Sequence, residues 1–288
     1  MPKYTSFKPS AAKNLKSKST YFSTENAIVM GILNITEDSF FDGGKYKTEE
    51  EIINKCHKML EEGASIIDIG AQSSRPGAQA ISTKQELSNL LPIIKLLRSR
   101  FPNLILSVDT YWAKVAEECI KAGANIINDI SAGELDERMI DTIAELQVPY
   151  IIMHMKGTPS NMQKNPAYGD VTSEIISYFQ QKIKKLYTKG IKDIIIDPGF
   201  GFGKTLAHNY QLLNELEKFK QFGIPILVGT SRKSMIYKLL DNSPEQALNG
   251  TIITNTIALQ KGVNILRVHD VKEAIECIKI TTFAKNNC

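Results

Sequence analysis

Eight short runs of β-branched and apolar residues, separated by stretches with the spacing of amphipathic helices, limit most strongly how this chain folds. The runs are 27–35, 64–71, 104–110, 126–130, 149–155, 193–199, 224–230 and 265–270. They are apolar almost without interruption, which is typical of strands buried on both faces of a parallel sheet. The first intervening helix is marked at both ends, because residues 48–51 have capping-box spacing and Gly63 follows the last apolar position.

The number of strand and helix units favours one closed barrel. Three segments, EEGASIIDIG, KAGANIINDI and TKGIKDIIIDPG, repeat the order of helix end, glycine, apolar strand and polar residue. Eight such units in about 250 residues are typical of an α/β fold of the (β/α)8 TIM barrel type, and an open doubly wound sheet is the alternative. No internal linker indicates a second domain, so we expect a single barrel domain over residues 27–288.

Residues 1–26 are expected to form a poorly ordered leader. They are rich in Lys and Ser but contain no hydrophobic signal segment and no Arg, so a cytoplasmic protein is favoured over one with a transit peptide. No apolar run in the chain approaches the roughly 18 residues of a membrane span, so no membrane contact is expected.

Composition argues against nucleic-acid and disulfide-stabilised classes. With 288 residues, 42% of them hydrophobic, the chain is long enough to bury a full core. Its 35 basic and 31 acidic residues leave a net charge of +4, too balanced for a nucleic-acid surface. The four cysteines, at 56, 119, 277 and 288, have no C-x-x-C spacing, so we expect reduced thiols rather than metal ligands or disulfides.

Polar residues close every predicted strand. In chain order they are Asn34, Asp68, Asp109, Asn128 with Asp129, His154, Asp197, Ser231 with Arg232 and Lys233, and Arg267 with His269 and Asp270. A single Asp in such a place is most often a helix cap or a turn residue. Polar residues at all eight strand ends instead indicate an active site, because TIM barrels carry theirs at the C-terminal ends of the strands.

The chemistry of these residues divides along the chain. Strands two, three, four and six end in carboxylates and an amide, which suit a flat heterocycle with several N–H donors, since ionised carboxylates only accept hydrogen bonds. The last two strands end in Lys233, Arg267 and His269, where this fold usually binds phosphate. The pattern predicts a polar heterocycle that carries a phosphate or diphosphate.

The segment IIIDPGFGFGKT, residues 194–205, has the ending of a phosphate-binding loop but not its beginning. A P-loop needs glycine five residues before Gly203, where this chain has Pro198, which has no N–H. We therefore expect its acid, Asp197, to matter more than its lysine. His154, which lies between two methionines and has no metal-ligand partner at suitable spacing, is expected to be a core residue rather than a catalytic one.

Two long loops follow the first two strands. TEDSFFDGGKY, residues 36–46, combines two adjacent phenylalanines with a Gly pair, and QSSRPGAQAIS, residues 72–82, carries Arg75 among small residues. Exposed aromatic residues have no benefit in ordinary connections, so both loops are predicted to close over a substrate and exclude water.

At these positions the chain resembles the dihydropteroate synthases of folate biosynthesis, from about residue 28 to beyond 275. The motifs MGILNITEDSFFDGG, DIGAQSSRPGA, SVDT, INDI, DPGFGFGK, GTSRKS and RVHDV occur in the family's order. The resemblance implies joining of 4-aminobenzoate to 6-hydroxymethyl-7,8-dihydropterin diphosphate with release of diphosphate. It also implies Mg²⁺, a homodimer and a target of sulfonamides.

The resemblance also implies a role for each matching residue. The pterin would be held by Asp68, Asp109, Asn128, Met153, Asp197, Phe202 and Lys233. The diphosphate would be bound by Asn34, Arg75, Arg267 and His269, with Mg²⁺ on Asn34. Aminobenzoate would contact Ser74, Arg75, Ser231 and Lys233. Arg75, Lys233 and Arg267 would be the catalytic groups, and the glycines after Asp197 would let the backbone approach the pterin ring.

Three residues depart from the family's commonest pattern: Glu37 replaces Pro, Gln72 replaces Glu and Ser74 replaces Thr. Two rival interpretations remain. A methyltransferase that acts on methyltetrahydrofolate and a corrinoid protein would not need Arg75 or the cationic end of the last strand. A non-catalytic paralogue is expected to lack Asn34, Lys233 or Arg267, and this chain has all three.

Overall fold

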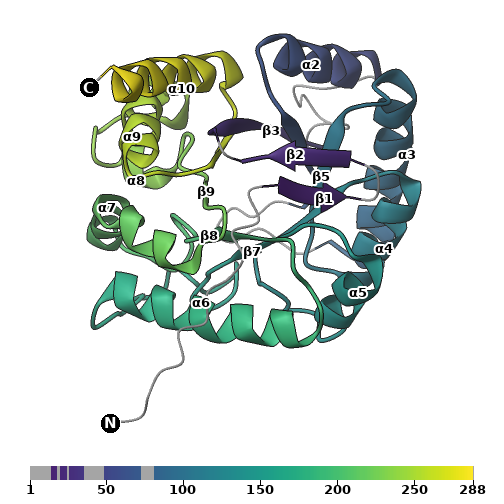
Figure 1. The fold of residues 1–288 in the computed structure, drawn as a ribbon, viewed down its shortest axis with the longest axis horizontal. Helices are drawn as coiled ribbons and strands as arrows, with labels where there is room; N and C mark the ends of the chain where they lie inside the picture. The colour runs from purple at the N-terminus through teal and green to yellow at the C-terminus, as the bar shows by residue number, and fades with distance from the viewer. Residues whose placement is uncertain (1–13, 18–19, 25, 36–48, 73–80, 288) are drawn as a thin grey trace.

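Eight parallel strands form the centre of the fold, a computed structural model that describes residues 14–17, 20–24, 26–35, 49–72 and 81–287 (Figure 1). The strands are β3 (Ile28–Asn34), β4 (Ile66–Gly70), β5 (Ile105–Asp109), β6 (Ile126–Asp129), β7 (Tyr150–Met153), β8 (Ile194–Asp197), β9 (Leu227–Val228) and β10 (Ile265–Val268). They pair in the order β8-β7-β6-β5-β4-β3-β10-β9, and a parallel bridge between Ile196 and Ile226 joins the two ends of this order. The predicted TIM-type barrel is confirmed, and the open doubly wound sheet is wrong.

Helices surround the ring of strands (Figure 1). They are α2 (Glu49–Glu61), α3 (Thr83–Arg100), α4 (Ala113–Ala122), α5 (Met139–Leu146), α6 (Val171–Thr188), α7 (Leu206–Asn214), α8 (Ser234–Tyr237), α9 (Leu248–Gln260) and α10 (Val271–Asn286), with 3-10 turns η1 (Leu216–Phe222) and η2 (Pro244–Gln246). Each of the longer helices buries side chains in the layer between helices and strands, as Val115 and Cys119 do from α4. No helix within the described ranges is long and apolar enough to cross a membrane.

Side-chain alternation along the strands sets what faces the barrel interior. Ile66, Ile126 and Ile195 belong to one buried cluster inside the barrel, whereas their neighbours Ile67, Ile127 and Ile196 belong to the layer under the helices. Residues two apart on a strand share a face. Each inward isoleucine is therefore followed, two residues on and one layer higher, by an inward residue at the C-terminal end of its strand.

The segment expected to be a disordered leader contains a β-hairpin. Strands β1 (Asn14–Ser17) and β2 (Thr20–Ser23) pair antiparallel, with Leu15 opposite Phe22, and lie across the ring of strands (Figure 1). Leu15 is fully buried in the interior cluster with Met30 and Ile265, and the Asn264 amide donates to Thr24 O at 3.0 Å. One apolar side chain of this hairpin, Leu15, thus fills the end of the barrel, and the poor order expected for residues 1–26 as a whole stays a prediction.

The capping box proposed at residues 48–51 cannot be assessed at its first position, since residue 48 lies outside the described ranges, and α2 is described from Glu49 onward.

The prediction that the cysteines are free thiols is confirmed for the three that the structure describes. Cys56, Cys119 and Cys277 are buried free thiols, and Cys288 lies outside the described residues.

Candidate active site

The inward-facing polar residues meet in one layer at the C-terminal ends of the strands. Each lies two positions beyond an inward apolar residue, so that Asp68 follows Ile66, Asn128 follows Ile126 and Asp197 follows Ile195. Asp109 pairs in register with Asn128, and Gly70 with Asp109, which brings the polar ends of β4, β5 and β6 side by side. The barrel therefore collects the predicted pterin acceptors on one surface.

Arg267 lies among these acceptors rather than apart from them. Its Nε donates to Asp68 Oδ2 at 2.6 Å and its Nη2 to Asp109 Oδ2 at 2.9 Å, while Asn128 Nδ2 donates to Asp68 Oδ2 at 3.0 Å. The sequence suggested separate groups of acceptors and cations. Because β10 pairs with β3, and β3 with β4, the cation of the last strand reaches the acids of the early strands.

Burial controls the electrostatics of this layer. It raises the pKa of Asp109 to about 7, although the guanidinium of Arg267 opposes this, and it raises the pKa of Asp197 against the opposing charge of Lys233. Burial also lowers the pKa of Lys233 to about 8, which Asp197 counteracts. The layer thus holds carboxylates and cations whose charges offset one another, and a polar ligand can replace some of these ion pairs with its own hydrogen bonds.

Lys233 and Phe202 make a second wall of the site. Lys233 Nζ donates to Phe200 O at 2.6 Å and lies 4.8 Å above the centre of the Phe202 ring. Phe202 is buried with Met153, Tyr111 and other apolar residues in a cluster at the same end of the barrel. An apolar wall beside carboxylate acceptors suits a flat heterocycle with polar edges.

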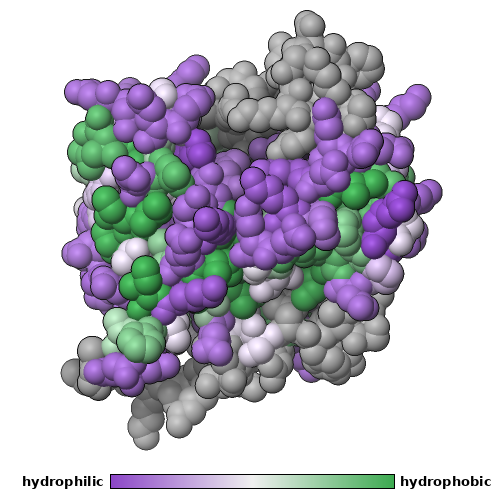
Figure 2. All heavy atoms as spheres, turned by 90° about the horizontal axis from the view of Figure 1, so that it is seen from above, coloured by the Kyte–Doolittle hydropathy of each residue, from purple (hydrophilic) through white to green (hydrophobic). Residues whose placement is uncertain are grey.

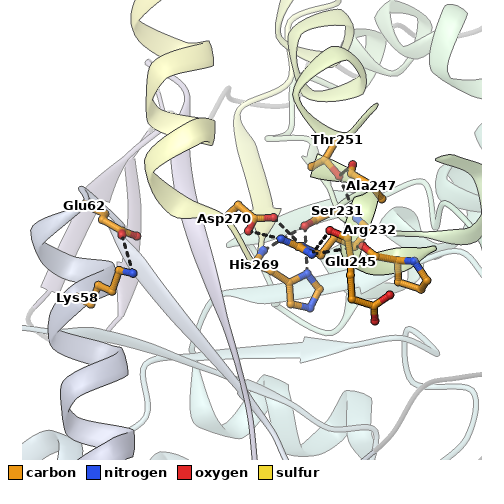
Figure 3. Close-up of polar contacts among 10 residues, drawn as sticks. Lys58, Glu62, Ser231, Arg232, Glu245, Ala247, Thr251, His269 and Asp270 are labelled. Atoms are coloured by element: carbon orange, nitrogen blue, oxygen red, sulfur yellow. Dashed lines mark hydrogen bonds and ion pairs between the residues drawn. The ribbon is translucent and has the colours of Figure 1, made fainter. Parts of the chain in front are cut away.

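Two pairs of residues join the segments that follow β9 and β10 (Figure 3). Ser231 Oγ and His269 Nδ1 lie 3.0 Å apart, and Arg232 grips Asp270 with its Nε and Nη2 at 2.9 and 2.8 Å. Burial lowers the pKa of His269 to about 4, so this residue offers a neutral N–H rather than the positive charge suggested by its position in the sequence. Ser231 is only 5% exposed, and its contact with aminobenzoate stays a prediction.

In the segment that resembles a P-loop, Lys204 and Thr205 make hydrogen bonds within the protein. Lys204 is buried and its Nζ donates to Gly199 O at 2.8 Å and Phe202 O at 3.1 Å, while Thr205 caps α7. A Cβ on Gly199 would overlap His154 O, so this glycine is required by the neighbouring chain segment, whatever ligand the loop faces. The prediction that the glycines after Asp197 also let the backbone approach the pterin ring stays a prediction.

The prediction that His154 is a core residue is confirmed. It is 7% exposed and its Nδ1 lies 3.1 Å from Lys204 Nζ. Asp129, which the sequence grouped with Asn128, faces the outer layer and accepts from the N–H of Ser131 and the hydroxyl of Tyr150. Alternation along β6 explains why one member of the pair joins the site and its neighbour organises a turn.

Three predicted residues cannot be placed within a complete site. Ser74 and Arg75 lie outside the described residues, as do all of the proposed closing loop 36–46 and residues 73–80 of the second loop. Asn34 ends β3 with its side chain exposed. No group of three or more His, Cys, Asp and Glu side chains that could hold a metal occurs in the described part of the chain.

Sequence reasoning missed several residues that the fold brings to the site. Tyr111, Met162 and Ile130 join Met153 and Phe202 in the apolar wall, and the Gln72 amide donates to the Tyr111 hydroxyl. Tyr111 immediately follows the SVDT motif, and its place just beyond a strand end was a usable signal. Met162 lies in a long connection where nothing in the local pattern marks it.

Comparison with known proteins agrees with this geometry. The family described as pterin binding enzyme matches residues 30–269. The dihydropteroate synthase of Escherichia coli K12 is 43% identical over 264 residues, which cover 90% of this chain and 93% of that protein. The dihydropteroate synthase of Bacillus subtilis is 42% identical over 258 residues, covering 89% and 88%.

Solved structures give the same result. The Yersinia pestis dihydropteroate synthase in a sulfonamide drug complex superposes with a TM-score of 0.90 at 41% identity, covering 95% of this chain and 99% of that one. The Xanthomonas albilineans dihydropteroate synthase with 4-aminobenzoic acid has a TM-score of 0.88 at 36% identity, covering 95% and 98%. Fold, strand-end residues and sequence similarity over nine tenths of the chain agree, and this protein belongs to the dihydropteroate synthase family.

Proposed function

We propose that this protein condenses 6-hydroxymethyl-7,8-dihydropterin diphosphate with 4-aminobenzoate to give 7,8-dihydropteroate and diphosphate. The observation that carries the proposal is the inward layer in which Arg267 contacts both Asp68 and Asp109 beside Asn128. This layer offers hydrogen-bond acceptors to a heterocycle and, from the same place, a guanidinium to its diphosphate.

The pterin is assigned to the acceptor side of the layer. Asp109, Asn128 and Asp197 receive or exchange hydrogen bonds with its amino and ring N–H groups, Asp68 supports them, and Lys233 donates to its carbonyl. Met153 and Phe202 cover one face of the ring. The burial of Asp68 and Asp197 supports this assignment, because a hydrogen bond to a buried carboxylate is stronger than one exposed to water.

The diphosphate is assigned to Arg267 and His269, with Arg75 reaching from the loop after β4. When diphosphate binds, the guanidinium of Arg267 exchanges at least one of its two carboxylate partners for phosphate oxygens. His269 donates from its neutral ring. Stabilising the charge that builds up on the departing oxygens is the main catalytic task of these groups.

Aminobenzoate is assigned to the outer side of the pocket, against Ser74, Arg75, Ser231 and Lys233. In the proposed order, diphosphate leaves first and the electron-rich dihydropterin stabilises the resulting cation. The neutral arylamine then attacks the exocyclic carbon and loses a proton. An amine of this kind needs no strong general base, so none has to be found among the strand ends.

Mg²⁺ is the metal that these donors fit best. Asn34 supplies an exposed amide oxygen at the end of β3, and Mg²⁺ usually takes only one or two protein oxygens, completing its shell with water and substrate phosphates. When bound, the ion would neutralise charge on the departing diphosphate. Asn34 would hold it.

Assembly and location belong to the proposal as well. Large apolar side chains are exposed on and near α8 to α10: Leu239, Leu240, Ile253, Ile280 and Phe283. Figure 2 shows green, apolar surface on the side of the molecule that carries α9 and α10. We assign this face to a homodimer, to be tested by light scattering. A cytoplasmic location stays a prediction.

The deciding experiment is product detection. Pure protein is incubated with the pterin diphosphate, 4-aminobenzoate and Mg²⁺, and dihydropteroate is measured by mass. Absence of dihydropteroate from folded protein would contradict the proposal. Diphosphate release from the pterin substrate alone, with water as nucleophile, tests the order of steps, since a concerted displacement would release none without the amine.

A further inference from the structure

The loop after β8 is bound by side chains at every one of its backbone carbonyls from Gly199 to Gly203. The donors, in the order of the five carbonyls, are Lys204, Lys233, Gln163, Lys204 again and Tyr168. Two of the donors come from the long segment between β7 and α6. Such complete pairing fixes a loop that contains three glycines with positive φ, of 77°, 82° and 62°, and would otherwise be flexible.

Lys204 makes the least expected of these contacts. Its side chain is buried, and its ammonium donates to the carbonyls of Gly199 and Phe202 at 2.8 and 3.1 Å and to His154 Nδ1 at 3.1 Å. Burial lowers the pKa of Lys204 to about 7, while the negative charge of Asp197 opposes this effect. Burial lowers the pKa of His154 to about 2, so its ring is neutral and Nδ1 acts as an acceptor.

No ion pair between Lys204 and a carboxylate occurs in the described part of the chain, although other lysines there do form such pairs. A buried ammonium held only by neutral acceptors is costly, and an apolar side chain of similar length would avoid that cost. Lys204 has four acceptors, because the carbonyl oxygen of His154 also accepts from its Nζ at 3.4 Å, and together they must provide something that an apolar side chain could not. All four lie on segments that shape the pocket wall.

Two links join Lys204 to groups assigned to the pterin. The N–H of Gly199 donates to Asp197 Oδ1 at 2.8 Å, and the carbonyl of the same residue accepts from Lys204. Phe202 has its carbonyl bonded to Lys204 and its ring below Lys233. His154 adds a third connection, because its backbone N–H donates to Asp197 O at 3.0 Å.

We propose that Lys204, with His154 as its acceptor, is a positioning residue of the pterin pocket: it holds the backbone of Gly199 and Phe202 so that the Asp197 carboxylate and the Phe202 ring keep their places. The inference rests on the proposed function, since it concerns the pocket assigned to the pterin. Lys204 touches no substrate in this arrangement and acts through the loop.

The test is Lys204→Met, which keeps most of the length of the side chain and removes its donors. We expect KM for the pterin diphosphate to rise by about tenfold or more, since two buried carbonyls lose their donor and the loop relaxes. KM for aminobenzoate should change less than about twofold. Lys189→Met is the control, because Lys189 Nζ also makes a side-chain hydrogen bond, to Asp141 Oδ1, but at an exposed site.

Two further variants separate positioning from general destabilisation. His154→Gln keeps a side-chain acceptor for the Lys204 ammonium and should leave KM for the pterin diphosphate near normal. His154→Leu removes that side-chain acceptor and should raise this KM. All rates are measured well below the thermal midpoint of each variant. If Lys204→Met fails to fold, the comparison of the two His154 variants decides.

The outcomes are distinct. Lys204→Met with both KM values unchanged and only a lower thermal midpoint would overturn the inference, as would equal KM values in His154→Gln and His154→Leu. If the unaltered protein makes no dihydropteroate, the proposed function fails instead. The inference is then decided by titration calorimetry of unaltered and Lys204→Met protein with the dihydropterin, in which equal affinities, or no binding to either, would overturn it.

Discussion

Replacing Asp197 by asparagine separates its contact with the loop from its contact with the ligand. The side chain is 6% exposed, and its Oδ1 accepts the N–H of Gly199 at 2.8 Å. We assign the other carboxylate oxygen to an N–H of the pterin. Asparagine can keep the first hydrogen bond through its own oxygen while presenting an NH₂ group to the ligand, where a donor would face a donor.

The expected loss follows from this geometry. A hydrogen bond to a charged group contributes about 1.5 to 3 kcal/mol, so Asp197→Asn should weaken pterin binding roughly 10- to 150-fold. Asp197→Ala removes both hydrogen bonds. It also leaves the buried N–H of Gly199 unpaired, at a cost of about 1 to 3 kcal/mol in folding free energy, or about 2 °C of Tm or more for each kcal/mol.

The assays are titration calorimetry with the dihydropterin and thermal unfolding of the same samples. Both variants should lose affinity, and Asp197→Ala should also be less stable than Asp197→Asn. Wild-type affinity in Asp197→Asn would refute the assignment of its second oxygen to the pterin. Equal stability of the two variants would refute the structural role of the Gly199 contact.

Three further predictions concern stability. Glu86 is fully buried on α3, and burial raises its pKa from 4.5 to about 7, so the stability of the fold should fall as pH rises from about 4.5 to 7. Glu86→Gln should therefore raise Tm at pH 8 by an amount equivalent to roughly 3 kcal/mol and leave Tm at pH 4 nearly unchanged, as thermal melts at the two pH values would show. Gly199→Ala should abolish pterin binding, because its Cβ would overlap His154 O. Gly190 has a similar φ of 81° but no atom within 4 Å of such a Cβ, so Gly190→Ala should lower the free energy of unfolding by only about 1 to 2 kcal/mol. Equal effects of the two variants in thermal melts and calorimetry would contradict the close approach at Gly199. Leu15→Ala should lower stability by about 2 to 5 kcal/mol without changing either KM, and an unchanged Tm would show that the hairpin does not stabilise the barrel.

The sequence by itself was sufficient to predict the barrel and the chemical type of its site. Each β-branched run became a strand because continuous apolar segments can be buried only inside a parallel sheet. The polar residue that closes each run, such as Asp68 or Asp197, could be recognised because strand ends in this fold share one face of the barrel. Local patterns also identified His154 as a core residue and Cys56, Cys119 and Cys277 as free thiols.

Only the tertiary structure determined which of these residues contact one another. Arg267 pairs with Asp68, which lies 199 positions earlier, because the last strand closes the barrel against the first. The neutral state of His269 depends on burial, to which several elements contribute. The places of Leu15 at the barrel end and of Lys204 behind the pocket also depend on the tertiary structure. The neighbours of Leu15 inside the barrel and the His154 partner of Lys204 are distant in the chain, and a local pattern carries no information about contacts that form only when the barrel closes.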